Sequence, residues 1–311
     1  MSNSENKKIT ILGWAIIIAI PLVILISACE LTLRILFPDI NILTKVIRST
    51  ADSRGYVLKE NSKITYQGLY EKHKPIIWKI NPQGLRSDRV ENTISNKFRV
   101  LTYGDSETYG WSVDIKDSWQ RQMESLDTNI EVLNFGIPGY NVENIADHLQ
   151  HTIGDFHPDM LIYFFNKNDF YPAFNYNPLL SRSYAYLAFR MGIYQLSKEK
   201  RKAWRKSPEG AKFIQTHISR MLELSKQYKA PLYILVMHWD YVEPIQQLTE
   251  KDNETIKIIN IEKIVDKFKA IDAHLTKPAH SALAKYLCRQ ISADNTQKCT
   301  PHSFEQSFNY H

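Results

Sequence analysis

Two residues far apart in the chain, Ser106 and His274, are of the types that catalyse nucleophilic attack on a carbonyl group. Ser106 follows an apolar run and a glycine. A serine at the exit of a buried strand can act as a nucleophile while its backbone amide stabilises an oxyanion. Because serine is inert without a base, this interpretation requires a histidine and a carboxylate that orients it, which His274 and Asp272 supply. The sequence therefore predicts catalysis by Ser106, His274 and Asp272.

Apolar runs that alternate with amphipathic stretches predict the elements that position these residues. Strands are expected at 98–103, 130–135, 160–165 and 232–237, and helices at 117–126, 141–153 and 278–290, with a helical hairpin over 181–228. Asn141 is available as a helix cap. This order predicts an α/β fold with a three-layer, doubly wound parallel sheet of the flavodoxin-like kind, behind an N-terminal transmembrane helix.

Ligands bind at the carboxyl ends of the strands in such a sheet. Polar or glycine-rich turns follow three of the expected strands, at 104–106, 136–139 and 166–169. We expect these turns to converge on one edge of the sheet, where Ser106 lies.

Four short blocks of sequence, in order along the chain, carry a resemblance to a known family. They are Gly104-Asp105-Ser106-Glu107-Thr108-Tyr109-Gly110, Asn134-Phe135-Gly136-Ile137-Pro138-Gly139, Asn166-Lys167-Asn168-Asp169 and Asp272-Ala273-His274. From about 98 to 287 the sequence resembles the SGNH, or GDSL-type, hydrolases, and its apolar lead-in resembles their membrane-anchored bacterial branch. The resemblance implies the SGNH-hydrolase fold, with Ser106 as nucleophile, His274 as base and Asp272 as the acid. It also implies an oxyanion hole formed by the amides of Ser106 and Gly139 and the side chain of Asn168.

Two positions depart from the family pattern. Asn166 stands where the third block usually has a glycine, at the start of the turn that presents Asn168. The acid precedes His274 by two residues rather than three, because Ile271 occupies the other position.

The expected activity is serine esterase chemistry on an ester-linked acyl group of a lipid, a glycan or a small molecule. Water would release the acyl group in an esterase, and a sugar hydroxyl would accept it in an O-acyltransferase. A deacetylase acting on a cell-envelope glycan would use the same residues. From another class, the alternative is a non-catalytic scaffold or binding protein that retains the fold. Serine acyl transfer needs no metal and no organic cofactor, so none is expected.

The N-terminal region predicts a membrane anchor at 9–37. Residues 9–29 carry no charged side chain and would span roughly 31 Å as a helix, about the thickness of the hydrocarbon core. A cleaved signal peptide and a lipoprotein signal that ends at Cys29 are the alternatives. The apolar stretch continues past Cys29 to Phe37, which favours an uncleaved anchor.

The organisation expected along the chain is a short tail at 1–8, the anchor at 9–37, a membrane-proximal segment of short strands and turns at 38–95, a catalytic domain at 96–295 and a C-terminal tail at 296–311. The signal-like order of basic and then apolar residues favours a single-pass protein with an extracytoplasmic, periplasmic catalytic domain. Cys288 and Cys299 would either pair in an oxidising compartment, which supports the same orientation, or remain as two free, buried thiols.

Net charge and histidine content indicate further partners only weakly. A formal net charge of +6 suits an anionic lipid surface but is too mild to predict nucleic-acid binding. The basic run from Lys198 to Lys206 is interpreted as a solvated helix face. His148 and His151 are interpreted in the same way rather than as metal ligands, and His280 as structural.

The assignment of His274 as the base predicts how activity depends on pH. Because the imidazole must be neutral to accept the serine proton, ester hydrolysis should fall as the pH drops through about 6.5, the ordinary pKa of histidine. The measurement is the rate of hydrolysis of a simple aryl acetate between about pH 5 and 8. A flat profile over this range would contradict the assignment.

Overall fold

Residues 2–66, 75–93, 95–171, 176–249, 255–265 and 274–294 are described by a computed structural model of the chain. The chain divides into two units. Unit 1 consists of Met1–Lys45 and Asn177–Lys198, and unit 2 of Val46–Tyr176 and Glu199–His311. The sheet and the predicted catalytic residues belong to unit 2.

Unit 1 contains a long apolar helix and a shorter one. Helix α1 covers Ser2–Leu36, and its segment Gly13–Leu36 is long and apolar enough to cross a membrane, although a signal sequence would meet the same criterion. The 3-10 helices η1 (Ile42–Lys45) and η4 (Leu180–Arg182) and helix α5 (Tyr184–Leu196) complete the unit. An apolar helix therefore lies where the sequence predicts the anchor.

Unit 2 is built on a five-stranded, fully parallel sheet with the strand order β6-β5-β7-β8-β9. The strands are β5 (Phe98–Tyr103), β6 (Ile130–Asn134), β7 (Met160–Phe165), β8 (Leu232–Val236) and β9 (Ile256–Asn260). The three strands at 130–134, 160–165 and 232–236 are buried at every position, as expected for a parallel sheet covered on both faces. The predicted α/β fold is confirmed.

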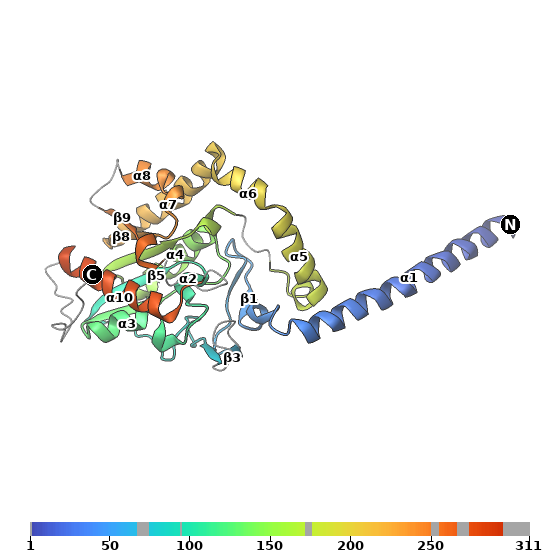
Figure 1. Cartoon of the computed structure of the whole chain (residues 1–311), viewed down its shortest axis with the longest axis horizontal. Helices are drawn as coiled ribbons and strands as arrows, with labels where there is room; N and C mark the ends of the chain where they lie inside the picture. The colour runs from blue at the N-terminus through green and yellow to red at the C-terminus, as the bar shows by residue number, and fades with distance from the viewer. Residues whose placement is uncertain are drawn as a thin grey trace, which may run out of the picture. The chain divides into compact units, whose positions relative to one another are not determined.

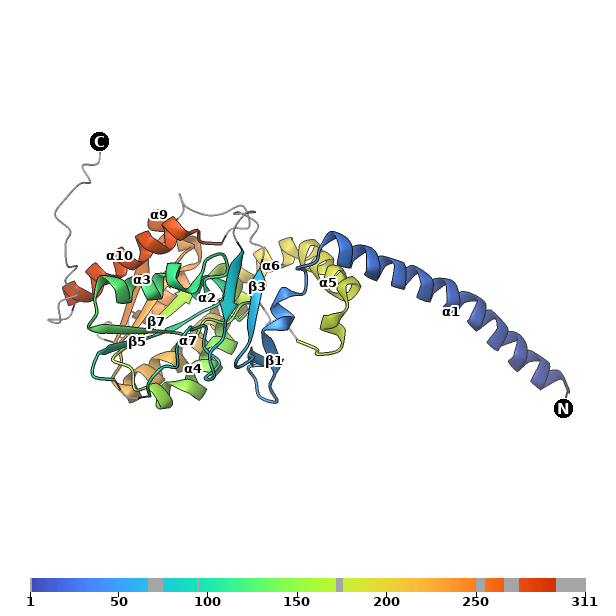
Figure 2. The same cartoon turned by 90° about the horizontal axis from the view of Figure 1, so that it is seen from below.

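Helices cover both faces of this sheet (Figures 1 and 2). Figure 2 shows α3 (Trp119–Leu126) and α10 (Lys277–Asp294) on one side, and α4 (Val142–Phe156) and α7 (Pro208–Tyr228) on the other. The remaining helices are α2 (Ser106–Tyr109), α6 (Lys198–Arg205), α8 (Glu243–Thr249), α9 (Glu262–Val265) and the 3-10 helices η2 (Ile115–Asp117), η3 (Lys167–Phe170) and η5 (Trp239–Tyr241). Asn141 caps α4 as predicted, because its side chain accepts a hydrogen bond from Asn144 N at 2.9 Å.

Three expectations about the elements were wrong or incomplete. Strand β9 was not predicted, because its apolar run is short and interrupted by Lys257. The segment 181–228 contains three helices rather than a hairpin of two. His148 is buried against the rings of Tyr103, Phe135 and Tyr140, not solvated, and burial lowers its pKa to about 3.

Among the described residues no group of three or more His, Cys, Asp and Glu could hold a metal ion.

Short strands precede the sheet in the chain. Strand β1 (Ile47–Ser49) pairs antiparallel with β2 (Tyr56–Leu58), and β3 (Lys63–Tyr66) pairs antiparallel with β4 (Ile76–Lys79). Their inner side chains include the fully buried Tyr56 and Trp78. These strands therefore pack against the rest of unit 2 rather than forming a separate spacer.

A buried ion pair holds the start of strand β5. The side chain of Arg99 is 2% exposed and donates from Nε to Glu131 Oε2 at 2.8 Å, which links β5 to β6. The same guanidinium donates to the carbonyl oxygens of Thr93, Phe156 and Asn92 at 2.6–2.8 Å. One cation therefore satisfies a carboxylate and three backbone carbonyls.

Replacement of Arg99 should lower the free energy of unfolding substantially. Arg99→Met leaves the Glu131 carboxylate and three carbonyls without their donor, and the free energy of unfolding should fall by about 3–5 kcal/mol. The matched control is Arg48→Met, whose partner Glu60 lies at the surface, and its effect should be about 1 kcal/mol or less. Urea denaturation of the full chain in detergent measures both. Equal effects in the two variants would contradict the role given to the buried pair.

Candidate active site

Ser106 lies where strand β5 passes into a short helix. Strand β5 ends at Tyr103, Gly104 makes the turn, and Ser106 is the first residue of α2. A Cβ atom on Gly104 would come within 2.2 Å of Thr108 Oγ1, so only glycine allows α2 to fold back so closely on the strand. The carboxylate of Asp105 caps the helix by accepting from Glu107 N at 2.9 Å. The hydroxyl group is thus held, partly exposed, at the carboxyl edge of the sheet.

His274 meets this hydroxyl from the segment that leads into α10. Its Nε2 atom lies 2.9 Å from Ser106 Oγ, which is hydrogen-bonding distance. The indole of Trp111 stacks on the imidazole, with ring centroids 5.8 Å apart and planes inclined by 17°. Both the serine and the histidine are partly exposed, so a substrate can approach them. The structure therefore brings together two residues that are 168 positions apart in the chain.

Glu107 connects the nucleophile turn to the histidine segment. Its carboxylate is buried beside Ser106 and accepts a hydrogen bond from Leu275 N at 3.0 Å. This contact holds the backbone immediately after His274 against α2. Sequence reasoning missed Glu107, because a glutamate in a first helical turn is normally exposed and its partner lies far along the chain. We regard it as a positioning residue.

The predicted acid, Asp272, lies outside the described residues, in the interval 266–273. Its assignment stays a prediction from the sequence. The same holds for Cys299, the expected partner of Cys288, whose own side chain is buried on α10.

Asn168 is presented by the 3-10 helix η3, directly after strand β7. Its Nδ2 atom donates to Asp105 Oδ2 at 3.3 Å, and Asn166 Nδ2 donates to the same oxygen at 3.3 Å. The backbone of Asn166 has φ −130° and ψ 162°, an extended conformation that any residue adopts. The departure from glycine at this position therefore imposes no backbone strain on the turn that carries Asn168.

Two buried carboxyl groups, Asp105 and Asp169, lie beneath this turn. Burial raises the pKa of Asp105, and burial together with the charge of Asp105 raises the pKa of Asp169 well above its ordinary value. Asp169 Oδ2 accepts a hydrogen bond from Asn166 N at 2.5 Å. Both shifts disfavour the charged forms of these carboxyl groups, because burial removes them from water.

Gly139 lies in the turn after strand β6, with φ +83°, and is exposed at the surface. Tyr56 supports this turn from β2 by donating from its hydroxyl to Pro138 O at 2.7 Å. The turn also packs directly against the nucleophile helix, since a Cβ atom on Gly136 would lie 2.3 Å from Tyr109 N. The turns of Ser106, Gly139 and Asn168 thus follow three adjacent strands, as the sequence predicts.

Residues from the segment before the sheet support the site from behind. The buried Arg86 donates to the carbonyl oxygens of Gly110 and Val113, each at 2.5 Å, and to that of Tyr109. Trp78 packs its ring against Trp111, with centroids 4.4 Å apart, and donates from Nε1 to Trp111 O at 3.2 Å. Strand β4 and the loop after it therefore fix the end of α2 and the indole that stacks on His274. Neither residue had been singled out from the sequence.

His280 is buried on α10, where its Nδ1 accepts a hydrogen bond from Trp119 N at 3.2 Å. Burial lowers its pKa to about 3, so the ring is neutral at neutral pH. The structural role predicted for His280 fits this position.

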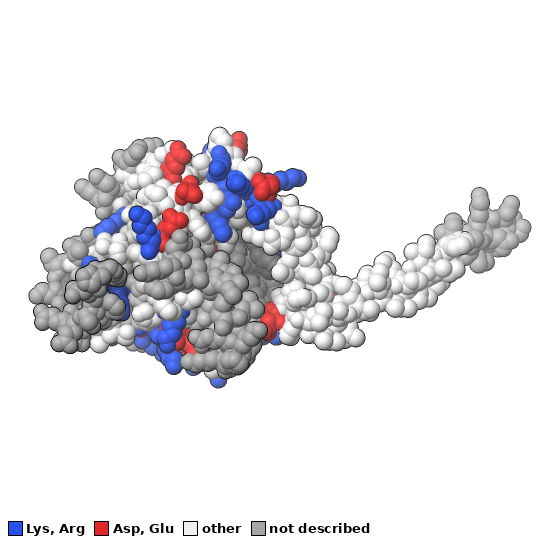
Figure 3. Space-filling view, viewed as in Figure 1, with Lys and Arg blue, Asp and Glu red and all other residues white. Residues whose placement is uncertain are grey.

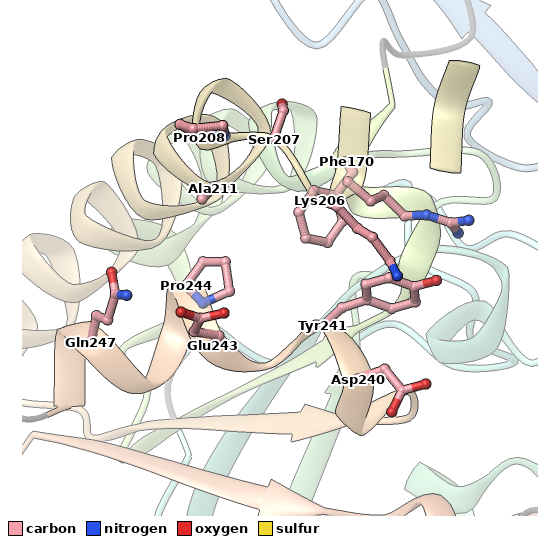
Figure 4. A pocket seen from close by; sticks show the side chains of 11 residues that line it. Phe170, Lys206, Ser207, Pro208, Ala211, Asp240, Tyr241, Glu243, Pro244 and Gln247 are labelled. Atoms are coloured by element: carbon pink, nitrogen blue, oxygen red, sulfur yellow. The ribbon is translucent and has the colours of Figure 1, made fainter. Parts of the chain in front are cut away.

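A cavity of about 450 Å³ lies beside the loop that carries Asn168 (Figure 4). It opens between the N-terminal end of α7 and the segment formed by η5 and α8, and Phe170 of η3 contributes to its wall. Figure 4 shows Glu243, Pro244 and Tyr241 below the cavity, with Ser207 and Pro208 above it. The guanidinium of Arg205 lies 4.7 Å from the centroid of the Tyr241 ring. The basic run is therefore only partly solvated, because Arg205 is partly buried at this wall.

No family model and no curated protein matches this sequence. Among solved structures, a lipolytic G-D-S-L protein from Desulfitobacterium hafniense matches with 15% identity and a TM-score of 0.42, covering 62% of this chain and 99% of its own. Esterase EstA from Pseudoalteromonas matches with 15% identity and a TM-score of 0.45, covering 64% and 100%. A lipolytic G-D-S-L protein from Veillonella parvula matches with 12% identity and a TM-score of 0.45, covering 62% and 98%. Likeness at this level does not extend to activity, which depends on the site itself.

The positioning role of Glu107 can be tested by a pair of substitutions. Glu107→Ala removes the acceptor for Leu275 N and releases the segment of His274, so kcat for an aryl acetate should fall by about 10²-fold, as expected for a small misplacement of a catalytic group. Glu107→Gln keeps an oxygen acceptor and should restore most of the rate. If both variants lose activity equally while retaining the wild-type melting temperature, the hydrogen bond is not what positions His274.

Proposed function

We propose that the chain is a membrane-anchored serine ester hydrolase of the SGNH, or GDSL-type, family. The single observation that carries this proposal is the 2.9 Å separation of His274 Nε2 and Ser106 Oγ at the carboxyl edge of a parallel sheet. The four sequence blocks support it, since the described residues of all four lie at that edge or lead to it. A serine with only a structural role would have no reason to hold a partly exposed imidazole within hydrogen-bonding distance of its hydroxyl group.

The proposed reaction begins when His274 Nε2 accepts the proton of Ser106 and the serine oxygen attacks the ester carbonyl. The amides of Ser106 and Gly139 and the Nδ2 group of Asn168 stabilise the oxyanion. The imidazolium then protonates the leaving alcohol, which departs as the acyl-enzyme forms. His274 next deprotonates a water molecule, whose attack releases the acid and restores the serine. Asp272 would orient the imidazole and stabilise its charged form.

The stacked indole of Trp111 assists the same cycle. An aromatic face attracts a cation, so Trp111 favours the imidazolium that forms when His274 takes the proton. Trp78 fixes the indole through its ring contact and its hydrogen bond to Trp111 O. The ring plane of His274 is thereby held while the proton moves.

The cavity whose wall includes Phe170 of η3 favours a second candidate, a deacetylase or O-acyltransferase acting on a cell-envelope glycan. Its wall carries the hydrogen-bond acceptors Asp240, Glu243 and Gln247 together with the aromatic ring of Tyr241. Carboxylate and amide oxygens accept hydrogen bonds from hydroxyl groups, and aromatic faces pack against apolar ring faces. Such a wall suits a hydroxyl-rich alcohol portion better than a long acyl chain.

Helix α1 is proposed to remain as a single-pass anchor, with the catalytic domain on the extracytoplasmic side. The helix continues without interruption through Cys29 to Leu36, and the large apolar side chains from Trp14 onward are exposed. This continuity favours an uncleaved anchor over a lipoprotein processed at Cys29. The signal-like order of Lys7 and Lys8 followed by an apolar segment supports the orientation. The count of basic residues does not, since Arg34, Lys45 and Arg48 lie beyond the segment.

Labelling with a fluorophosphonate probe tests the nucleophile. The wild-type chain should be labelled at Ser106, and Ser106→Ala should lose both labelling and aryl acetate hydrolysis while keeping its circular dichroism spectrum. Ser112→Ala, a partly exposed serine on the neighbouring loop, is the matched control and should label like wild type. Hydrolysis of the aryl acetate by Ser106→Ala at the wild-type rate would overturn the assignment of Ser106 as the nucleophile. An unlabelled wild-type protein would favour the non-catalytic scaffold.

A further inference from the structure

Exposed apolar side chains outside α1 are concentrated in one segment. Among the described residues, ten large hydrophobic side chains beyond Phe37 are exposed, and seven of them lie between 179 and 196. These seven are Leu179, Leu180, Phe189, Met191, Ile193, Tyr194 and Leu196. The terminal residues of the segment are the most exposed, Leu179 at 78% and Leu196 at 88%. Figure 3 shows that the surface over α5 is nearly free of charged atoms, like that over α1.

The N-terminal end of α5 is fastened to the last turns of α1. The carboxylate of Glu30 accepts from Tyr184 N at 3.0 Å, from Ala185 N at 2.9 Å and from Ser183 Oγ at 2.9 Å. Arg34 pairs with Glu30 and donates to Arg182 O at 3.3 Å. These contacts satisfy the free amides at the start of α5 with a side chain of α1.

The position of Glu30 along α1 indicates how deep in a bilayer the contact between α1 and α5 would lie. Glu30 precedes Leu36, the last residue of α1, by about 9 Å along the helix axis at 1.5 Å per residue. If α1 spans a bilayer, the joint lies at the boundary between the acyl chains and the headgroups, where a charged pair and a polar helix end are tolerated. Helix α5 therefore starts at the membrane surface.

The composition after this joint matches a helix that lies in that boundary. Helix α5 carries one charged side chain, Arg190, and the segment is followed directly by Lys198, Lys200 and Lys202, which are exposed. Burial of apolar side chains in the acyl boundary and attraction of basic residues to anionic headgroups are the two forces that hold interfacial segments. Left in water, these exposed apolar side chains would be unfavourable, since burying apolar surface lowers the free energy.

We propose that residues 179–196 form a second membrane contact, which inserts its apolar side chains into the same leaflet boundary that α1 leaves. The occupant of this surface is the lipid bilayer, and Lys198 at the end of unit 1 meets its anionic headgroups. The inference rests on the proposed anchoring by α1 and is independent of the proposed esterase activity. The chain is thus attached by a span and by an in-plane helix.

The test uses the full chain in nanodiscs of phosphatidylcholine and phosphatidylglycerol. Ile193→Cys is placed on the proposed contact, and Lys97→Cys, exposed in unit 2, is the matched control. Both are made in a background of C29S, C288A and C299S. The reaction rate with a sulfonated, membrane-impermeant maleimide should be at least tenfold lower at position 193 than at position 97. Equal rates in a chain that co-elutes with nanodiscs would overturn the inference while leaving the anchor intact.

A second measurement separates lipid from protein as the covering partner. A bimane label at position 193 should be quenched by lipids that carry a nitroxide on the acyl chain, and a label at position 97 should not. Slow maleimide reaction without quenching would mean that unit 2 or a second copy of the chain covers α5, which also overturns the proposal. A chain that does not co-elute with nanodiscs at all refutes the anchor itself. Fluorophosphonate labelling of Ser106 reports separately on the proposed activity.

Discussion

The buried carboxyl group of Asp105 is the interaction on which the geometry of the candidate site depends. One oxygen caps the helix that begins with Ser106, and the other accepts hydrogen bonds from Asn166 and Asn168. A single side chain therefore couples the loop after β5 to the loop after β7. Because Asp169 lies close enough for its charge to matter, the cost of a second buried negative charge also acts on this junction.

The second requirement is rigidity, which the sheet alone does not supply. The hydrogen bonds of the sheet fix a turn only where it joins the strand. The rest of the turn needs contacts with other segments of the chain. Arg86, Trp78 and Tyr56 provide them from the segment before the sheet, through hydrogen bonds to backbone carbonyls and ring contacts. The segment interpreted from the sequence as membrane-proximal is also the back wall of the site.

Unit 1 differs from unit 2 in which of its side chains are exposed. Its helices expose apolar side chains that water would penalise, and their polar ends satisfy one another through Glu30, Arg34 and the start of α5. A segment that satisfies its backbone internally and leaves its side chains apolar is suited to a lipid environment. The described surface of unit 1 is thus largely apolar, as the proposed attachment to a membrane requires.

The sequence by itself determined the local elements and the edge on which chemistry is placed. Apolar runs of five or six residues predicted four of the five strands, Asn141 was identified as a cap, and the polar or glycine-rich turns after three strands placed Ser106, Gly139 and Asn168 at one edge of the sheet. These features depend on periodicity and backbone conformation, which are properties of nearby residues. Only the tertiary structure decided that Glu107 meets Leu275, that Arg86 lies behind α2 and that His148 is buried. Such contacts join residues far apart in the chain, and whether a polar side chain is buried is set by the elements that pack over it.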